Sequence, residues 1–259
     1  MNFKYNYHTH TSRCNHAAGS DADYARAAYE AGFKTVGFSD HAPLAPFPGG
    51  FESWYRMKPE ETEGYMESIR SLKREYDGRM KIFCGFELEY YPKLFDETVE
   101  MLRPHKPDYF ILGQHFIRNE CDGPYSASIN NSEDFLTYCD QVCTAMKTGR
   151  FTYLAHPDLV IAPDDRETYL LGMDKVCKCA KAEGMPLEYN LLGLSAGRAY
   201  PTKRFFELAA ENGCDVILGL DAHTPDAFRC GKWADAAEEF LASVGIKPLG
   251  EIELRNPIK

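Results

Sequence analysis

The chain has 259 residues, of which 44% are hydrophobic and 26% charged, a composition typical of one large folded domain. We therefore predict a single domain over residues 1–259. The formal net charge of −10 argues against a nucleic-acid partner, because a phosphate backbone attracts basic surfaces. The acidity still permits a small phosphorylated ligand, since bound metal cations reverse the field locally.

The opening segment MNFKYNYHTH contains no apolar run of the kind found in signal peptides. No stretch approaches the ~18 apolar residues needed to span a bilayer, so we expect no membrane partner. The nine cysteines form no C-x-x-C motif, and the pairs 139/143 and 177/179 fall within expected helices. We interpret the cysteines as reduced thiols of a cytoplasmic protein. A homo-oligomer is compatible with the sequence, which leaves the oligomeric state open.

Strand-like and helix-like apolar periods alternate along the chain. The expected strands are residues 3–7, 34–39, 81–88, 108–114, 151–155, 186–190 and 215–220. The expected helices are residues 21–32, 59–76, 92–102, 132–147, 165–183, 202–212 and 232–244. Seven βα units without a linker predict an α/β fold with a parallel sheet.

Imidazole and carboxylate groups recur where these strands end. The candidates are His8, His10, His16, His41, Glu87, His115, His156, Asp221 and His223. In a closed parallel barrel the C-terminal ends of the strands meet at one face, which would gather these groups together. Candidates on at least six strands favour a closed barrel over an open doubly wound sheet, whose ligands cluster at one switch point. Such groups bind divalent Zn, Mn or Fe, so the pattern predicts a multi-metal hydrolase.

Each signal also has an ordinary structural interpretation. His8 and His10 share one strand face and can reach one ion, but a chance H-x-H is not rare in a chain with eight histidines. His115 and His156 follow apolar runs, where a buried histidine bonded to a backbone carbonyl would look the same. His105 stands between two prolines in a polar loop, and we expect it on the surface.

The ordered motifs H-T-H, N-H-A, S-D-H, G-F-E-L-E-Y, G-Q-H-F, A-H-P-D and L-D-A-H resemble those of the PHP superfamily (polymerase and histidinol phosphatase). The resemblance extends from His8 to about Pro225. Within the superfamily, GFELEY, ILGQHFI and the segment 188–201 look most like the stand-alone histidinol-phosphate phosphatases. The resemblance implies a distorted (β/α)7 TIM-like barrel that holds three divalent ions, commonly Zn, Mn or Fe, at the C-terminal ends of the strands.

The resemblance also distributes the candidate ligands among the three ions. The first ion would be held by His8, His10, Glu87 and Asp221. The second would share Glu87 as a bridge and be held by His115 and His156. The third would be held by His16, His41 and His223. Asp40 would orient a ligand imidazole through a hydrogen bond, although an Asp at a strand end can be only a turn residue.

The implied reaction is hydrolysis of L-histidinol phosphate to L-histidinol and phosphate, in histidine biosynthesis, by a metal-activated hydroxide. Arg198 is the candidate phosphate clamp, and Asp158 the candidate proton donor to the leaving alkoxide. Either could instead be an ordinary loop or turn residue. The segment Ala42–Met57, with Trp54 and Tyr55, would form a lid over the cationic amine, or only cover the barrel rim. Asn190 completes the expected substrate contacts.

The sequence departs from the family pattern in two places. Asn6 stands where many relatives have Asp, and DLVIAPDD follows His156 where relatives often have basic residues. A different small phosphomonoester, such as phosphotyrosine, therefore remains an alternative substrate. A metal-dependent amidohydrolase is disfavoured because no expected strand ends in the lysine those enzymes use. A non-enzymatic module like those fused to DNA polymerases is disfavoured because every candidate ligand is retained.

Overall fold

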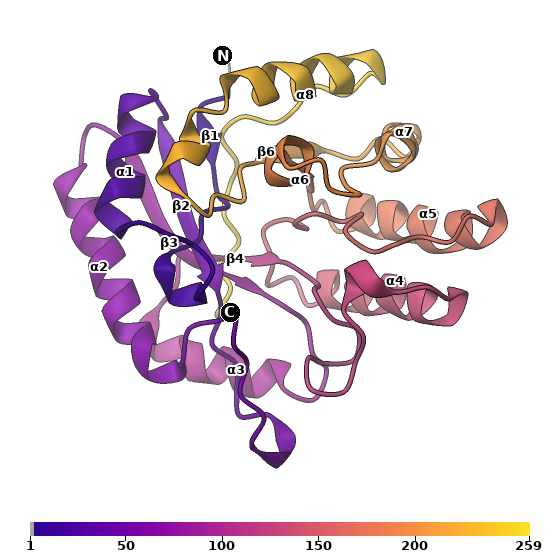
Figure 1. The fold of residues 1–259 in the computed structure, drawn as a ribbon, viewed down its shortest axis with the longest axis horizontal. Coiled ribbons are helices and arrows are strands. Elements are labelled where there is room, and N and C mark those ends of the chain that lie inside the picture. The colour runs from indigo at the N-terminus through magenta and orange to yellow at the C-terminus, as the bar shows by residue number, and fades with distance from the viewer. Residues whose placement is uncertain (1–2) are drawn as a thin grey trace.

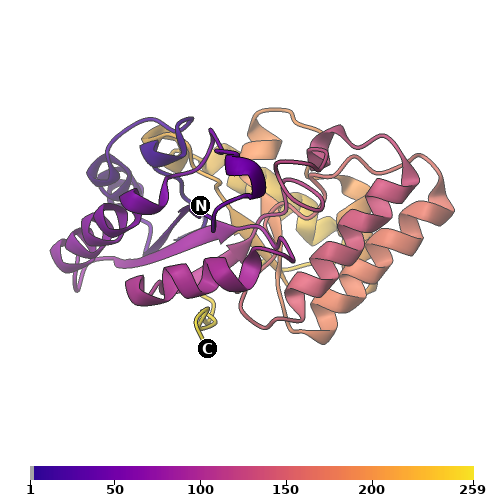
Figure 2. The same cartoon turned by 90° about the horizontal axis from the view of Figure 1, so that it is seen from below.

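The computed structural model describes residues 3–259 as parallel strands surrounded by helices (Figures 1 and 2). The strands are β1 (Tyr5–Asn6), β2 (Thr35–His41), β3 (Lys81–Leu88), β4 (Tyr109–Leu112), β5 (Leu187–Asn190) and β6 (Val216–Gly219). The helices are α1 (Asp21–Glu30), α2 (Thr62–Glu75), α3 (Phe95–Leu102), α4 (Ser132–Met146), α5 (Arg166–Ala182), α6 (Leu191–Ser195), α7 (Lys203–Glu211) and α8 (Gly231–Ser243). Within residues 3–259, no helix is both long and apolar enough to cross a membrane.

The strands form an incomplete ring. The order β1-β2-β3-β4 is parallel throughout, and β5 pairs in parallel with β6. Leu154 joins the two sheets through bridges to Leu112 and Leu187. A parallel bridge between Thr9 and Ala222 closes the ring on the opposite side. The expected TIM-like α/β fold is therefore confirmed, with two of its junctions reduced to isolated bridges.

The predicted strand over residues 151–155 is the main local difference. Only Leu154 is bridged, although Thr152 donates to Phe110 O at 2.8 Å and Glu188 donates to Leu154 O at 2.9 Å. The backbone of His156 then turns into the left-handed region at φ 29°, which ends the extended segment. The short helix α6 was not predicted, because five residues carry too little periodicity.

The apolar residues form an outer and an inner cluster. The outer cluster lies between the strands and the surrounding helices. The inner one comprises Tyr7, Tyr109, Ile111, Tyr153, Ala155 and Ile217. They come from β4, from β6, from the residue after β1 and from the segment 151–155, and they meet inside the ring. Ile252 and Leu254 of the C-terminal segment, yellow in Figure 2, pack against this inner cluster.

Two glycines make room for the side chain of Tyr109, which lies inside the ring. A Cβ at Gly37 would lie 2.3 Å from the Tyr109 hydroxyl, and one at Gly85 would lie 2.6 Å from the Tyr109 ring. The hydroxyl donates a 2.7 Å hydrogen bond to Tyr7 O across the barrel. The filled interior leaves the C-terminal ends of the strands as the place for a cavity.

Candidate metal centre

The nine predicted ligand side chains lie at one end of the barrel. Eight of them line a single cavity of about 430 Å³: His10, His16, His41, Glu87, His115, His156, Asp221 and His223. The ninth, His8, is fully buried directly beside Asp221 and Glu87. Sequence positions more than 200 residues apart therefore meet, as expected for groups at the C-terminal ends of parallel strands.

The first group of side chains converges on a common point. His8 Nε2 and His10 Nε2 lie 3.2 Å apart. The Asp221 Oδ1 atom is 3.5 Å from His8 Nε2 and 3.1 Å from His10 Nε2. Glu87 Oε2 is 3.6 Å and 3.4 Å from the same two nitrogens. This set offers two imidazole nitrogens and two carboxylate oxygens, which is a suitable donor set for zinc.

The second oxygen of Glu87 faces a different pair of imidazoles. Glu87 Oε1 is 2.8 Å from His156 Nε2 and 3.5 Å from His115 Nε2. A Cβ at Gly113 would lie 1.9 Å from this oxygen, so only glycine leaves room for the carboxylate there. Glu87 thus has one oxygen directed at each of two groups, the arrangement that a bridging ligand requires.

The third group consists of three imidazoles. His16, His41 and His223 each offer a nitrogen within 4.8 Å of the others. His16 Nδ1 lies 2.7 Å from Cys14 O, and His223 Nδ1 lies 2.9 Å from Asp221 O. Because these Nδ1–H groups donate to carbonyls, both Nε2 atoms are left as lone-pair donors.

Burial and charge prepare the site for cations. Burial alone would raise the pKa of Glu87, but the imidazoles of His115, His41 and His8 outweigh it and hold that pKa well below its usual range. Burial together with neighbouring imidazoles lowers the pKa of His223 to about 3, which keeps this ring neutral. Burial alone would lower the pKa of His8, but the carboxylates of Glu188, Asp221 and Glu87 outweigh it and raise that pKa to about 10, so a metal that binds this ring must displace its proton.

Two buried polar atoms that lack hydrogen-bond partners within the described part of the chain also indicate a cation site. Glu87 Oε2 and His41 Nδ1 lie 3.2 Å apart, yet neither has a hydrogen-bond partner among residues 3–259. Buried polar atoms are costly when unpaired, and a cation between them would remove that cost. The residues present therefore fit a divalent metal.

Three further carboxylates lie next to the Nδ1 atoms of candidate ligand histidines. His8 Nδ1 donates to Glu188 Oε1 at 2.8 Å, and His115 Nδ1 donates to Glu89 Oε1 at 3.0 Å. Asp40 Oδ1 lies 3.4 Å from His10 Nδ1, and its other oxygen accepts from the backbone of Thr11. Such contacts fix the tautomer of a ligand histidine. Asp40 therefore lies beside a candidate ligand, but the expected hydrogen bond is not formed, because His10 Nδ1 has no hydrogen-bond partner among residues 3–259.

The supporting roles of Glu188 and Glu89 were missed. Glu188 sits in a strand whose residues are all buried, and a carboxylate in such a strand is the signal that could have found it. A Cβ at Gly219, on the neighbouring strand, would lie 1.8 Å from Glu188 Oε1.

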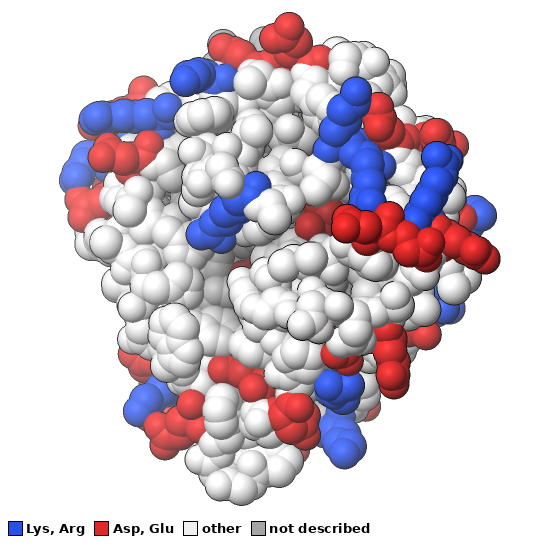
Figure 3. Space-filling model, turned by 45° about the vertical axis from the view of Figure 1, so that its right-hand side comes forward, with Lys and Arg blue, Asp and Glu red and all other residues white. Residues whose placement is uncertain are grey.

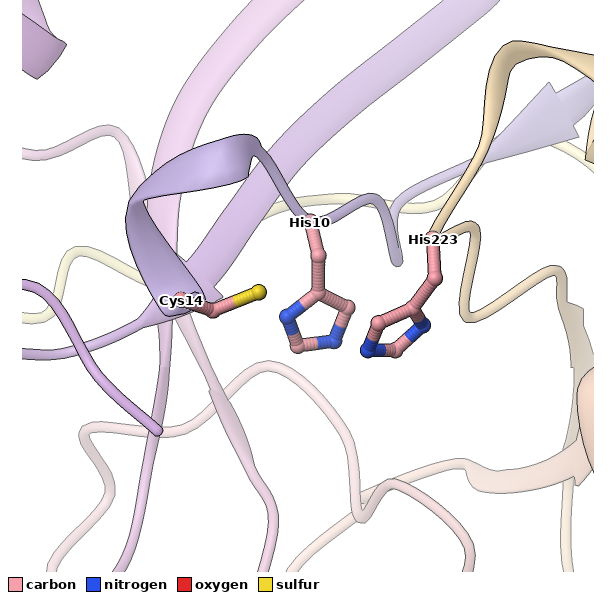
Figure 4. A group of neighbouring side chains, drawn as sticks. All are labelled: His10, Cys14 and His223. Atoms are coloured by element: carbon pink, nitrogen blue, oxygen red, sulfur yellow. The ribbon is translucent and has the colours of Figure 1, made fainter. Parts of the chain in front are cut away.

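A cysteine lies next to the imidazoles (Figure 4). The sulfur of Cys14 points toward the His10 ring, and the His223 ring stacks on that ring with centroids 4.2 Å apart. The thiol donates to Thr11 O at 3.1 Å and is fully buried. Cys14 is therefore a buried neighbour of the His10 ring.

The outer wall of the cavity is largely aromatic and apolar. It comprises Trp54, Tyr55, Phe116, Tyr125, Leu159, Leu192, Arg198 and Tyr200. Among the described residues that line the cavity, Arg198 supplies the only Lys or Arg side chain, and its guanidinium donates to the Tyr200 hydroxyl at 2.8 Å. Figure 3 shows a hollow on this face of the molecule, walled mostly by uncharged side chains. Trp54, Tyr55 and Arg198 are therefore placed as the sequence predicted.

Two predicted site residues lie elsewhere. Asn190 is fully buried, donates to Glu188 and to Asp221, and caps α6 through Gly193 N, so it supports carboxylates and does not line the cavity. Asp158 is also outside the cavity lining and accepts a 2.5 Å hydrogen bond from Thr202 N. The hydrogen bonds of Asn190 to two buried carboxylates, and of Asp158 to the Thr202 backbone, hold these side chains outside the cavity lining.

His105 is set apart from the centre, as expected. Its ring is paired with Glu63 at 2.8 Å on the outside of the barrel. His105, which the sequence pattern excluded from the candidate ligands, therefore also lies outside the candidate metal centre.

Comparisons with known proteins agree with this geometry. The family model described as "PHP domain" matches residues 6–192. "Probable histidinol-phosphatase" from Deinococcus radiodurans is 30% identical over 247 residues, covering 90% of each chain. "Histidinol-phosphatase" from Bacillus subtilis is 27% identical over 267 residues, covering 90% of this chain and 97% of that one.

A solved structure has the same fold. The histidinol phosphate phosphatase from Lactococcus lactis, complexed with zinc, L-histidinol and phosphate, matches with a TM-score of 0.73 at 18% identity. The match covers 99% of this chain and 98% of the other. At this identity the similarity shows the fold.

Proposed function

Because the chain belongs to the PHP domain family, we propose that it is a metal-dependent phosphomonoesterase that hydrolyses L-histidinol phosphate to L-histidinol and phosphate. The observation that carries the proposal is Glu87, whose two oxygens face separate groups of imidazoles. The names of the relatives from D. radiodurans and B. subtilis support this substrate. The zinc, L-histidinol and phosphate in the L. lactis structure support it as well.

We assign three divalent ions to the three groups of side chains. The first would be held by His8, His10, Glu87 and Asp221, the second by Glu87, His115 and His156, and the third by His16, His41 and His223. When bound, such ions supply a nucleophile from water at neutral pH and neutralise phosphate charge. Zinc is the first choice because it is the metal in the L. lactis structure, while Mn and Fe suit the same donors.

The residues of the wall bind and orient the substrate. Arg198 faces the cavity with a planar guanidinium that can pair with two phosphate oxygens. Tyr200 accepts a hydrogen bond from that guanidinium and so holds its orientation. The aromatic faces of Trp54 and Tyr125 suit the imidazole ring and the ammonium group of the substrate.

In this proposal Asp158 has a structural role. Burial raises its pKa to about 6, with the backbone N–H of Thr202 opposing the shift. The carboxylate holds the backbone just after Tyr200 and thereby positions the wall that carries Arg198. We therefore do not retain it as the acid for the leaving alkoxide.

A second phosphomonoester is favoured by one observation. Leu159 lines the cavity in the segment after His156 where relatives often have a cation. An aryl phosphate such as phosphotyrosine would find an apolar surface there.

We place the enzyme in a reducing cytoplasm, which is supported by the nine cysteines, all free thiols.

The test is phosphate release from a panel of monoesters. We expect kcat/KM on L-histidinol phosphate to exceed that on phosphotyrosine and on p-nitrophenyl phosphate by at least about 100-fold, since several polar contacts discriminate together. Equal values on the three substrates would reject histidinol phosphate as the substrate.

A further inference from the structure

Arg56 is an unusually buried cation beside the metal centre. Its side chain is only 4% exposed, and it is not one of the proposed metal ligands. Its Nε and Nη2 atoms donate to Glu120 Oε2 at 3.2 and 2.8 Å. Its Nη1 and Nη2 atoms donate to the two oxygens of Glu89 at 3.1 and 3.0 Å. A buried guanidinium with this many directed partners holds a fixed geometry.

One partner of Arg56 touches a metal-centre imidazole. Glu89 Oε1 accepts from Arg56 and also from His115 Nδ1 at 3.0 Å. That contact keeps the proton on Nδ1 and directs the lone pair of His115 Nε2 toward Glu87. Without the cation, the buried Glu89 carboxylate would lack its main counter-charge and would lose this fixed position.

Arg56 also closes the loop that forms one wall of the cavity. Its Nη1 atom donates to Ala42 O at 2.9 Å, joining the two ends of the segment 42–56. Ala42 directly follows His41, and the hydroxyl of Tyr55 contacts both Arg56 and Glu89. Through its hydrogen bond to Glu120, Arg56 also holds the loop after His115, which carries Phe116 and Tyr125. One guanidinium thus connects the ends of β2 and β3 and the loop after β4.

We propose that Arg56 is a positioning residue that orients His115 through Glu89 and fixes both aromatic loops of the cavity wall. This role deepens the proposed function: it rests on the metal centre of that function but not on the identity of the substrate. Arg56 does not line the cavity. Its loss should affect the ion held by His115 and His156 more than the other ions.

The first variant is Arg56→Met, which keeps length and removes charge. We expect the chelator concentration that removes the first metal ion per chain to fall at least tenfold, which matches the 10- to 100-fold effect typical of outer-shell changes. We also expect faster hydrogen exchange in residues 42–58 and a higher KM. The matched control is Arg118→Met, on the same loop as Glu120, whose side chain is 52% exposed and pairs with Asp134.

A second variant covers the case in which Arg56→Met fails to fold. The triple change R56M/E89Q/E120Q leaves no unpaired charge, so it should fold. It should still lose the same metal ion more easily, because the neutral amide that replaces the Glu89 carboxylate holds the His115 proton less firmly. Wild-type metal retention and wild-type exchange in either folded variant would overturn the role of Arg56. Absence of turnover on histidinol phosphate by the wild-type chain would instead overturn the substrate, so the two failures are distinguishable.

Discussion

At the scale of single residues, the centre depends on how each carboxylate divides its two oxygens. Glu87 directs one oxygen at His8, His10 and His41 and the other at His115 and His156. A monodentate amide cannot reproduce this, since only one of its two terminal atoms is a donor to a metal. Glu87 is therefore the position at which we expect the proposed centre to be most sensitive to substitution.

We expect Glu87→Gln to lower kcat/KM by more than about 100-fold, beyond the range of outer-shell changes. It should also leave the purified protein with fewer metal ions than the wild type. Metal analysis and phosphate release on the same sample provide the check. Asp226→Asn, at a side chain that is 81% exposed, is the control and should change neither quantity. Full metal content together with full turnover in Glu87→Gln would contradict the bridge.

Arg198 provides the second prediction at this scale. Arg198→Met should raise KM by about 10- to 100-fold, the value of one hydrogen bond to a charged group. The number of bound metal ions should remain unchanged, because Arg198 contacts Tyr200 and not an imidazole. Steady-state kinetics measures the effect, with Arg229→Met as the control, since that side chain is 85% exposed. An unchanged KM would remove Arg198 from the phosphate site.

The carboxyl group of Glu89 should make the free energy of unfolding depend on pH. Burial alone would raise its pKa, but Arg56 outweighs it, and with the hydrogen bond from His115 it lowers the pKa to about 2, compared with 4.5 for an unperturbed Glu. A lowered folded-state pKa adds stability above pH 4.5 that is lost as the pH falls toward 2.

The free energy of unfolding of the metal-free wild type should therefore exceed that of Glu89→Gln at pH 7. The difference, on the order of 3 kcal/mol, should shrink as the pH falls below about 4.5. Denaturant unfolding at several pH values measures it. A difference that stays constant down to pH 3 would show that Glu89 is not stabilised as an ionised group.

At the scale of elements, the strands and helices were predictable because their apolar periods are long and their caps are explicit. The α1 helix begins after the capping box of Ser20 and Asp23, where the sequence placed its start. The segment 151–155 was less predictable, because its pairing depends on neighbours distant in sequence and its end on the backbone of His156. The ligand set was accessible from strand ends together with family motifs.

The supporting residues were not predictable in the same way. Arg56 lies in a loop rich in Pro and Gly, and nothing local distinguishes it from a solvated arginine. Its burial follows from Glu89 and Glu120, which are 33 and 64 residues away. Asn190 and Asp158 were placed in the cavity by position alone, whereas their actual partners come from other elements.

Close approach between elements gives a further prediction. Gly113→Ala should displace Glu87, because the new Cβ would lie 1.9 Å from Oε1. We expect a loss of stability of about 1–3 kcal/mol from overpacking and a reduced metal content. Denaturant unfolding and metal analysis measure both. Gly64→Ala in α2 is the control: its Cβ meets no atom within 4 Å, and it should stabilise the helix slightly. Unchanged metal content in Gly113→Ala would contradict the crowding argument.

At the scale of the whole molecule, the proposed metal centre would link the two sheets of the barrel. Its ligands come from both sheets, which are otherwise joined through isolated bridges at Leu154 and between Thr9 and Ala222. Ions that bind only the folded state should therefore stabilise the entire ring. An ion present at 100 times its Kd adds about 2.7 kcal/mol.

Removing the metals should accordingly lower the melting temperature by roughly 5–10 °C for each such ion, given the size of the chain. Calorimetry before and after treatment with a chelator, followed by zinc addition, measures the loss and its recovery. A melting temperature that is unaffected by the chelator would mean that the ions do not connect the two sheets.

The central claim is that several ions, sharing Glu87, act together on a phosphomonoester. The most direct measurement is phosphate release from L-histidinol phosphate while metal-free protein is titrated with zinc. We expect little activity after one equivalent and a plateau near three ions per chain. Full activity at one equivalent, or activity that persists without added metal, would contradict it.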